Sequence, residues 1–342
     1  MDTHNLHPAI QRRIDAYTDL IPAPLHSLWG SNDAQVIDRF HNEGFMHTHK
    51  QFFSPQQERL VGMWNFSRDK LPADLVVSDT TLFTLADDMA GEFSEWIAKH
   101  RSQDKGASIR FTVNLQITKT GESLAGRSFF FEAKIESSSQ NTLTVRATVH
   151  DAENNTQIIA VRGVFVTVLV AKTGIMNKSA AEPVITVPSP LLSVPDAVSL
   201  EAADLSDLCS VMNFLPHNAV STTAGSLSRS EKSIATVLNF GPKLTGPVVY
   251  VHGGVLGTVL YIASRKLLQL LTGQSISAVH WDITYKSPMP IESTNNVIYA
   301  HVESEVSQSI TVFAKIMRGD KVYTTLRSVF SFKAMAVGQS KL

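Results

Sequence analysis

The sequence has almost no cysteine, no excess of either charge and no long apolar run. The single cysteine, Cys209, excludes an internal disulfide framework and a cysteine-rich metal site, and it fits a reducing compartment. Formal net charge is -1, from 30 basic and 31 acidic residues, so no global field draws the chain to nucleic acid or to an anionic membrane. We therefore expect no nucleic-acid partner and no membrane span.

Known targeting and catalytic motifs are also missing. Residues 1–17 are rich in charge and carry no apolar stretch of signal-peptide length, so we expect a soluble, cytoplasmic protein, with a mitochondrial location left open. No phosphate-binding Gly-Lys-Ser/Thr loop, dinucleotide fingerprint or Gly-X-Ser-X-Gly elbow is present, which argues against nucleotide hydrolases, Rossmann enzymes and serine hydrolases. His47 and His49 lack further ligands nearby, and we predict no metal.

Two similar segments lie far apart in this chain of 342 residues. Leu60–Phe66 (LVGMWNF) and Ile234–Phe240 (IATVLNF) align at an offset of 174, taking Asn239 minus Asn65. Both predict a strand that enters a turn. Self-similarity at a fixed offset is typical of a duplicated structural unit.

A helical pattern follows each of these segments. Apolar residues recur at the spacing of an amphipathic helix in the first copy, and every matched position in the second copy is also apolar. The first set is Leu82, Leu85, Ala86, Met89, Phe93, Trp96 and Ile97, and the second is Leu256, Val259, Leu260, Ala263, Leu267, Leu270 and Leu271.

Four strand-like runs then follow each helix. Alternating β-branched and aromatic residues, bounded by turn residues, indicate antiparallel hairpins. The matched runs are 109–118 with 277–286, 129–137 with 296–304, 143–150 with 310–317, and 159–166 with 324–331. We predict an α+β fold with an N-terminal extension at 1–55, one repeat at 56–170, a linker at 171–228 and a second repeat at 229–336.

The two helix starts carry the most specific motifs. The second copy has His252-Gly253-Gly254-Val255-Leu256, and the first has Leu82-Phe83-Thr84-Leu85-Ala86-Asp87. These two motifs resemble those of the hotdog thioesterase superfamily, especially its phenylacetyl-CoA-thioesterase-like branch, whose signature is His-Gly-Gly, a short apolar stretch and Asp. The resemblance covers roughly residues 60–168 and 233–334. It implies a double hotdog, in which each repeat wraps an antiparallel sheet around a central helix.

Neither copy carries the complete signature. Ser78-Asp79-Thr80 replaces His-Gly-Gly in the first copy, and Tyr261 stands nine residues after His252, where the second copy should have its acid. In this branch the glycine turn and the acid of one site come from different protomers, which implies different repeats here. The resemblance thus implies one composite site, His252-Gly253-Gly254 with Asp87, and one position that has lost both parts.

Residue chemistry supports these assignments. A glycine turn at a helix start lets backbone N–H groups approach a thioester carbonyl oxygen, so the amide of Gly254, or of Gly253, is the predicted oxyanion donor. Helix geometry, at about 100° per residue, separates Asp87 from its neighbour Asp88. Asp88 shares a charged face with Glu92 and Glu95, whereas Asp87 lies among small or apolar residues suited to a packed partner.

Several roles stay open at this stage. Asp87 would act as general base on water or as nucleophile, and its alternative role is a hydrogen-bonded interface residue. His252 would orient the turn, touch the substrate carbonyl, or serve as a structural hydrogen-bond donor. As substrate-binding residues we assign Phe83, Gly91, Tyr261 and Arg265, the last for the phosphates of coenzyme A, with Lys243, Lys266 and Lys286 nearby.

The sequence therefore predicts an acyl-CoA thioesterase with one composite site between two repeats. It needs no cofactor beyond the coenzyme A of its substrate. Two alternatives are a non-hydrolytic acyl-binding or scaffold protein and a biosynthetic dehydratase or cyclase on the same scaffold. Three questions are left open: the acyl-chain specificity, whether the thioester is of coenzyme A or of a carrier protein, and whether the protein forms a homo-oligomer.

Overall fold

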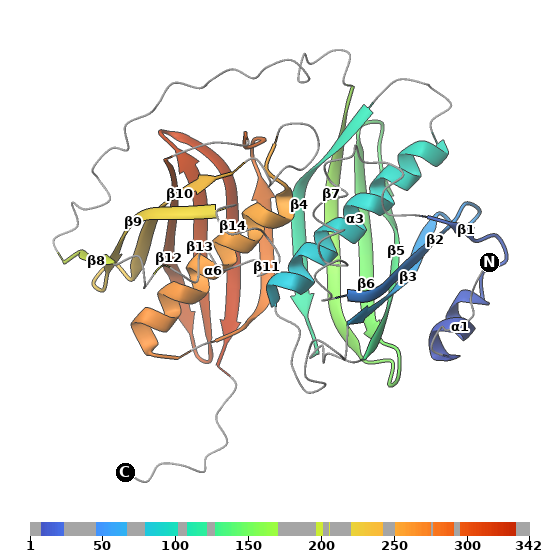
Figure 1. The fold of residues 1–342 in the computed structure, drawn as a ribbon, viewed down its shortest axis with the longest axis horizontal. Coiled ribbons are helices and arrows are strands. Elements are labelled where there is room, and N and C mark those ends of the chain that lie inside the picture. The colour runs from blue at the N-terminus through green and yellow to red at the C-terminus, as the bar shows by residue number, and fades with distance from the viewer. Residues whose placement is uncertain are drawn as a thin grey trace, which may run out of the picture.

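A computed structural model describes the conformation of residues 8–23, 46–66, 79–101, 108–121, 127–169, 196–200, 205, 220–241, 250–274, 276–290 and 295–332. Most of these residues belong to two long helices and one large sheet (Figure 1). The helices are α1 (Pro8–Ile14), α3 (Asp79–Arg101) and α6 (Gly253–Thr272).

All strands among the described residues join one 14-stranded antiparallel sheet in the order β1-β2-β3-β5-β6-β7-β4-β11-β14-β13-β12-β10-β9-β8. In the first half they are β1 (Ile21–Pro22), β2 (Met46–Ser54), β3 (Arg59–Phe66), β4 (Ser108–Lys119), β5 (Ser128–Ser138), β6 (Thr142–Asp151) and β7 (Gln157–Leu169). In the second they are β8 (Val198–Leu200), β9 (Val220–Ser228), β10 (Ser233–Phe240), β11 (Ala278–Tyr285), β12 (Asn296–Val306), β13 (Ser309–Arg318) and β14 (Lys321–Ser331).

The strand order is the same from either end of the sheet. In each half a long helix follows the second long strand, and the strand after that helix lies at the middle of the sheet. Thus β2, β3, α3, β4, β5, β6 and β7 hold the positions of β9, β10, α6, β11, β12, β13 and β14. Each predicted strand run and both predicted helices coincide with one of these elements.

The two halves join where β4 pairs with β11. Gln116 faces Asp282 at the centre of this pairing, with Leu115 facing Ile283 and Ile117 facing Trp281. Side chains reinforce the seam: Asn114 Nδ2 donates to Asp282 Oδ1 and to the carbonyl oxygen of Ile283, both at 2.8 Å. The sheet is therefore continuous through the whole protein.

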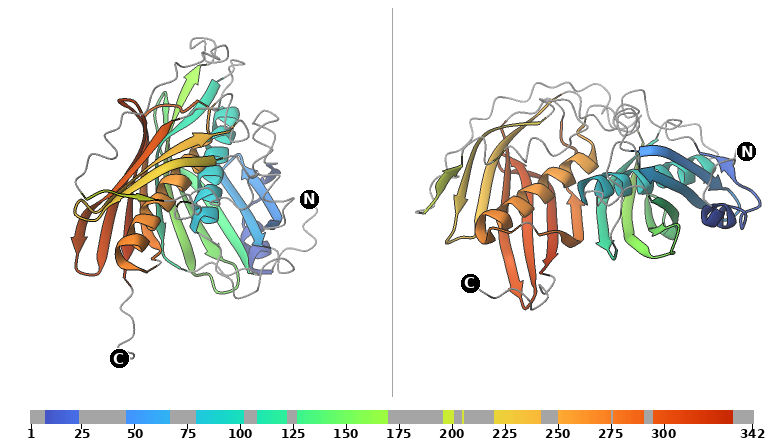
Figure 2. Two further views of the ribbon diagram at one scale, coloured as in Figure 1. Left: turned by 60° about the vertical axis from the view of Figure 1, so that its left-hand side comes forward. Right: turned by 60° about the horizontal axis from the view of Figure 1, so that its bottom comes forward.

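Both long helices cover one face of the sheet, and each contacts the other (Figure 2). α6 is mostly apolar and is the one helix, among the described residues, long and apolar enough to cross a membrane. The expectation that no such run exists was wrong on length and composition. However, 72% of the most apolar window is buried inside the protein, as expected for a core helix.

The opposite face of the sheet carries α1. Ile10 and Ile14 pack there against Phe52, Val61 and Phe130, which alternate along their strands with the residues that face the main core. The first half of the sheet is thus covered on both faces, by α3 and by α1.

Two details of the predicted organisation differ from the structure. β2 falls in the predicted extension and β9 in the predicted linker, yet they pair with β3 and β10 as full strands. Polar and apolar residues do not alternate regularly in β2 and β9, so their sequences do not indicate strands. The predicted alignment of β4 with β11 also differs from the structure by two residues. Leu115 faces Gly163 of β7, and Trp281 faces Ser328 at the equivalent position of β14. Leu115 therefore corresponds to Trp281.

Candidate active site

The start of α6 is built around His252. This residue is the N-cap, with φ -58° and ψ 137°, and its Nδ1 accepts a hydrogen bond from the amide of Gly254 at 3.0 Å. The cap satisfies one of the amides that every helix start leaves without an intrahelical partner. The Nδ1 atom of His252 is therefore an acceptor, and Gly254 has its N–H committed to the cap.

Gly253 is the first residue of α6, and no described group accepts a hydrogen bond from its amide. A Cβ added at this position would lie 3.1 Å from Asp87 Oδ2 and 3.3 Å from the Tyr285 hydroxyl oxygen. Both distances are tighter than ordinary contact, so only glycine fits without displacing its neighbours. Of the two predicted donors, Gly253 is the one whose amide stays available.

Asp87 reaches this helix start from α3, in the other half of the chain. Its side chain is 5% exposed, and its Oδ2 lies 3.8 Å from His252 Nδ1. Because this nitrogen already accepts from Gly254, the imidazole is neutral in this geometry, and the contact is not an ion pair. The structure thus brings together Asp87 and the His252-Gly253-Gly254 turn, which lie far apart in the sequence.

Tyr285, at the end of β11, completes the cluster. Its hydroxyl group donates to the carbonyl oxygen of Gly253 at 3.0 Å. Burial raises the pKa of Tyr285 well above 10, and the nearby negative charge of Asp87 raises it further. The phenol therefore keeps its proton at neutral pH and holds the first turn of α6 in place.

These residues border an open cavity of about 340 Å³. Its wall is mostly apolar, with a few polar groups, which is common in small-molecule sites. The lining comes from both halves: Asp87, Gly91, Arg110, Phe111, Thr112, Val113, Val166, Tyr250, Val251, His252, Gly253, Leu256, Tyr285, Lys286, Ser287, Pro288 and Met289.

Two cations lie at this cavity, Arg110 and Lys286. The Nε and Nη1 atoms of Arg110 are buried without a hydrogen-bond partner in the described part of the chain. Behind Arg110, its backbone amide donates to Glu95 Oε1 at 3.2 Å. Burial raises the pKa of Glu95 to about 7, and the charge of Arg110 opposes that rise only in part.

The predicted substrate-binding residues do not share one location. Gly91 lines the cavity, one turn along α3 from Asp87. Tyr261 and Arg265 lie on α6 away from its wall, and the side chain of Phe83 lies outside the described residues, as does Lys243. No group of three His, Cys, Asp or Glu side chains that could hold a metal occurs among the residues with a described placement.

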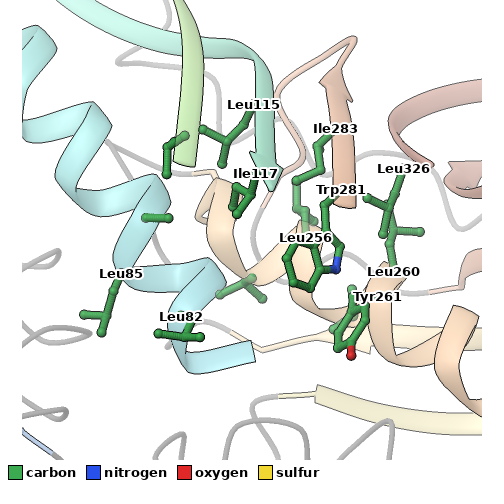
Figure 3. Close-up of a cluster of buried hydrophobic side chains, with 14 of the residues drawn as sticks. Leu82, Leu85, Leu115, Ile117, Leu256, Leu260, Tyr261, Trp281, Ile283 and Leu326 are labelled. Carbon is green, nitrogen blue, oxygen red and sulfur yellow. The ribbon is translucent and has the colours of Figure 1, made fainter. Parts of the chain in front are cut away.

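The position equivalent to Asp87 in the second half is filled by aromatic packing. Tyr261 is 1% exposed; its ring stacks on Phe330, with centroids 6.1 Å apart, and meets Trp281 edge-on at 5.7 Å. Figure 3 shows Tyr261 and Trp281 among leucine and isoleucine side chains of both helices and the central strands. Ser78, the other predicted part of this position, lies outside the described residues.

Sequence reasoning missed most of the residues that line the cavity, among them Arg110, Tyr250 and Tyr285. Arg110 is the third residue of β4, Tyr250 forms an isolated bridge with Pro290, and Tyr285 ends β11. None of them belongs to a motif. A signal was present only for Tyr285, since a tyrosine in the strand after the glycine turn has to bury its ring and find a partner for its hydroxyl group.

No protein-family model and no curated protein matches the sequence. The structure is similar to that of the tesB protein of Mycobacterium avium subsp. paratuberculosis, with a TM-score of 0.51 and 10% identity over 81% of this chain and 93% of that one.

Two further similar structures have lower scores. The 12:0-ACP thioesterase of Umbellularia californica has a TM-score of 0.49 and 8% identity, covering 80% of this chain and 94% of its own. The acyl-CoA thioesterase II TesB2 of Mycobacterium marinum has a TM-score of 0.43 and 9% identity, covering 82% and 94%. The chain has the hotdog-type fold that the resemblance of its helix-start motifs implied, and this likeness concerns the fold alone.

Proposed function

We propose that the protein is an acyl-CoA thioesterase with a double hotdog fold and one composite site between its two repeats. The observation that carries the proposal is the meeting of a buried carboxylate from α3 with the glycine start of α6 in one cavity: Asp87 Oδ2 lies 3.8 Å from His252 Nδ1. Hydrolysis needs a site for an oxyanion and a group that handles the proton of water.

Gly253 supplies the oxyanion donor in this proposal. Its amide is at the positive end of the α6 dipole, and no described acceptor competes for it. The acyl carbonyl oxygen would accept from this N–H as negative charge develops. Loss of one such donor typically reduces the rate about 100- to 1000-fold.

Asp87 assists the attack. As general base it would take a proton from water while the water oxygen bonds to the acyl carbon, and the carbon–sulfur bond would then break. The proton would pass from Asp87 to the departing thiolate, giving a free carboxylic acid and thiol. If Asp87 instead attacks directly, an acyl anhydride forms first and water cleaves it. Both routes give the same products.

Arg110 and Lys286 support a substrate with an anionic portion. A buried guanidinium group with two donors lacking a described partner is a costly arrangement that an incoming phosphate or carboxylate would relieve. Arg265, assigned from sequence to this task, lies away from the cavity. We propose that Arg110 takes the role.

The test is thiol release from a panel of short, long and aromatic acyl-CoAs and acyl carrier-protein thioesters. Asp87→Asn keeps the size of the side chain, and Asp88→Asn is the matched control one residue along. We expect release by the wild type and by Asp88→Asn, with at least about a 100-fold loss in Asp87→Asn. Saturable acyl-CoA binding without release by the wild type would instead support the acyl-binding alternative.

A further inference from the structure

Four basic side chains stand in one row on the face of the sheet that carries α1. Arg59 on β3 faces Lys134 on β5, Lys134 faces Arg146 on β6, and Arg146 faces Arg162 on β7. Side chains of directly opposed residues lie about 5 Å apart at Cβ, and like charges in such pairs destabilise a sheet. The row therefore costs the folded protein stability.

Nearby carboxylates compensate only the ends of the row. Arg59 forms an ion pair with Glu132, and Arg162 Nε pairs with Glu136 Oε2 at 2.6 Å. The two central residues, Lys134 and Arg146, have no acidic partner in the part of the chain that the structure describes. The uncompensated positive charge is thus concentrated in the middle of the row.

The fold itself does not require this row. At the equivalent positions of the second half the four side chains are Ser233, His301, Phe313 and Arg327, paired in the same way. Arg327 there lies over the Phe313 ring at 5.3 Å and pairs with Glu303 at 2.9 Å. The same architecture can therefore be built without opposed cations, which points to a ligand as the reason for them.

A polar cavity lies at the centre of the row. It measures about 250 Å³ and is bordered by Arg13, Glu132, Lys134, Arg146, Ala147, Thr148 and His150. Arg13 comes from α1, where its guanidinium group is held over the Phe130 ring at 4.8 Å. Three cations without a described acidic partner thus converge from the helix and from two strands.

We propose that this cavity binds a phosphate group, as the inorganic ion or as part of a soluble phosphate ester. Two guanidinium groups and one ammonium group exceed the two negative charges of a phosphate dianion, and the Glu132 carboxylate that also borders the cavity is paired with Arg59. Guanidinium groups bind phosphate oxygens through paired N–H donors. The Thr148 hydroxyl group offers a further donor. A water occupies about 30 Å³, so the cavity has room for a phosphate group and several waters.

This site is separate from the cavity at Asp87. The phosphate cavity lies on the α1 face of the sheet, whereas Asp87 projects from α3 on the other face. Its occupation does not depend on thioesterase activity, and the test below needs no acyl substrate.

The test uses the full chain and inorganic phosphate, with chloride at matched ionic strength and pH as reference. Thermal unfolding and calorimetric titration are measured for the wild type, Arg146→Gln and Lys134→Gln. Lys315→Gln is the control, because it removes the same charge from β13 in the second half, where Lys315 lies over the Tyr299 ring at 5.5 Å.

We expect saturable phosphate binding and a phosphate-dependent rise in Tm for the wild type and for Lys315→Gln. Each row variant should bind phosphate at least about tenfold more weakly. In chloride alone Arg146→Gln should unfold at a higher temperature than the wild type, because the like-charge contacts are relieved. Absence of saturable binding, an equal loss in Lys315→Gln, or unchanged binding in both row variants would overturn the proposal.

Discussion

The Nδ1 atom of His252 lies 3.0 Å from the amide nitrogen of Gly254 and 3.8 Å from Asp87 Oδ2. One ring nitrogen thus caps the helix that starts the site and faces the carboxylate of the other half. Protonation of this nitrogen would remove the cap and place a cation beside Asp87. The capping hydrogen bond and the electrostatics of the cavity are therefore linked through a single atom.

Two variants of His252 should show whether its capping hydrogen bond, and not merely the size of its side chain, stabilises the protein. His252→Ala removes the acceptor for the Gly254 amide and should lower the free energy of unfolding by about 1 kcal/mol. His252→Asn retains a side-chain acceptor at the N-cap and should be less affected. Urea denaturation of both variants measures the difference. An alanine variant as stable as the asparagine variant would contradict the capping role.

Two glycines at opposite ends of α6 should have opposite effects. Gly253→Ala places a Cβ 3.1 Å from Asp87 Oδ2, so thiol release should fall at least about tenfold while the fold is kept. Gly273→Ala puts alanine at φ +72°, where the C-cap requires a left-handed residue, and should cost about 1 kcal/mol without affecting the site. The rate of thiol release and the Tm of both variants check this contrast between lost activity and lost stability. Equal loss of activity in the two would argue against crowding of the site.

The position of Tyr261 should not accept the acid found at Asp87. Tyr261→Asp places a carboxylate in an aromatic cluster with Phe330 and Trp281, and should destabilise the protein by more than about 4 kcal/mol without creating a second site. Tyr261→Phe keeps the ring stacking and should stay within about 1.5 kcal/mol of the wild type. Denaturant midpoints give both values. A folded Tyr261→Asp protein with increased thiol release would refute the prediction.

Glu95 should make stability depend on pH near neutrality. Its pKa is raised from 4.5 to about 7 by burial, so the folded protein binds a proton that the unfolded chain releases. This contribution to stability is complete below about pH 4.5 and is lost as pH rises through about 7, a change on the order of 2 to 3 kcal/mol.

Glu95→Gln should flatten that part of the stability profile, measured by denaturant unfolding between pH 4.5 and 8. Glu58→Gln is the matched control, because hydrogen bonding to Arg101 lowers the pKa of Glu58, and that carboxyl group titrates below this window. Persistence of the neutral-pH slope in Glu95→Gln would assign it to another group.

Much of the fold could be predicted because it follows periodicity. The offset between Asn65 and Asn239 located matching strands, and the helical spacing of apolar residues located α3 and α6. β2 and β9 could not be predicted in this way. Their residues alternate poorly, and they are strands because β3 and β10 offer an edge to pair with.

The candidate site was predictable only where it rests on motif residues. Asp87 and Gly253 were identified because they match the motif of the family that the sequence resembles. Arg110 and Tyr285 instead reach the cavity through the pairing of β4 with β11, which links residues far apart in the sequence. The choice between Gly253 and Gly254 as free donor also required coordinates. It depends on the orientation of the His252 ring, whose Nδ1 accepts from the Gly254 amide and leaves that of Gly253 available.

The seam between β4 and β11 lies within one polypeptide, so the partners at the cavity cannot dissociate on dilution. Because both halves belong to one chain, they need not carry the same residues at matched positions. In an assembly of identical chains every substitution is made twice, and an acid cannot be kept on one side and replaced on the other. Here Asp87 and Tyr261 occupy matched places with different side chains, so one place could acquire an aromatic core while the other kept its carboxylate.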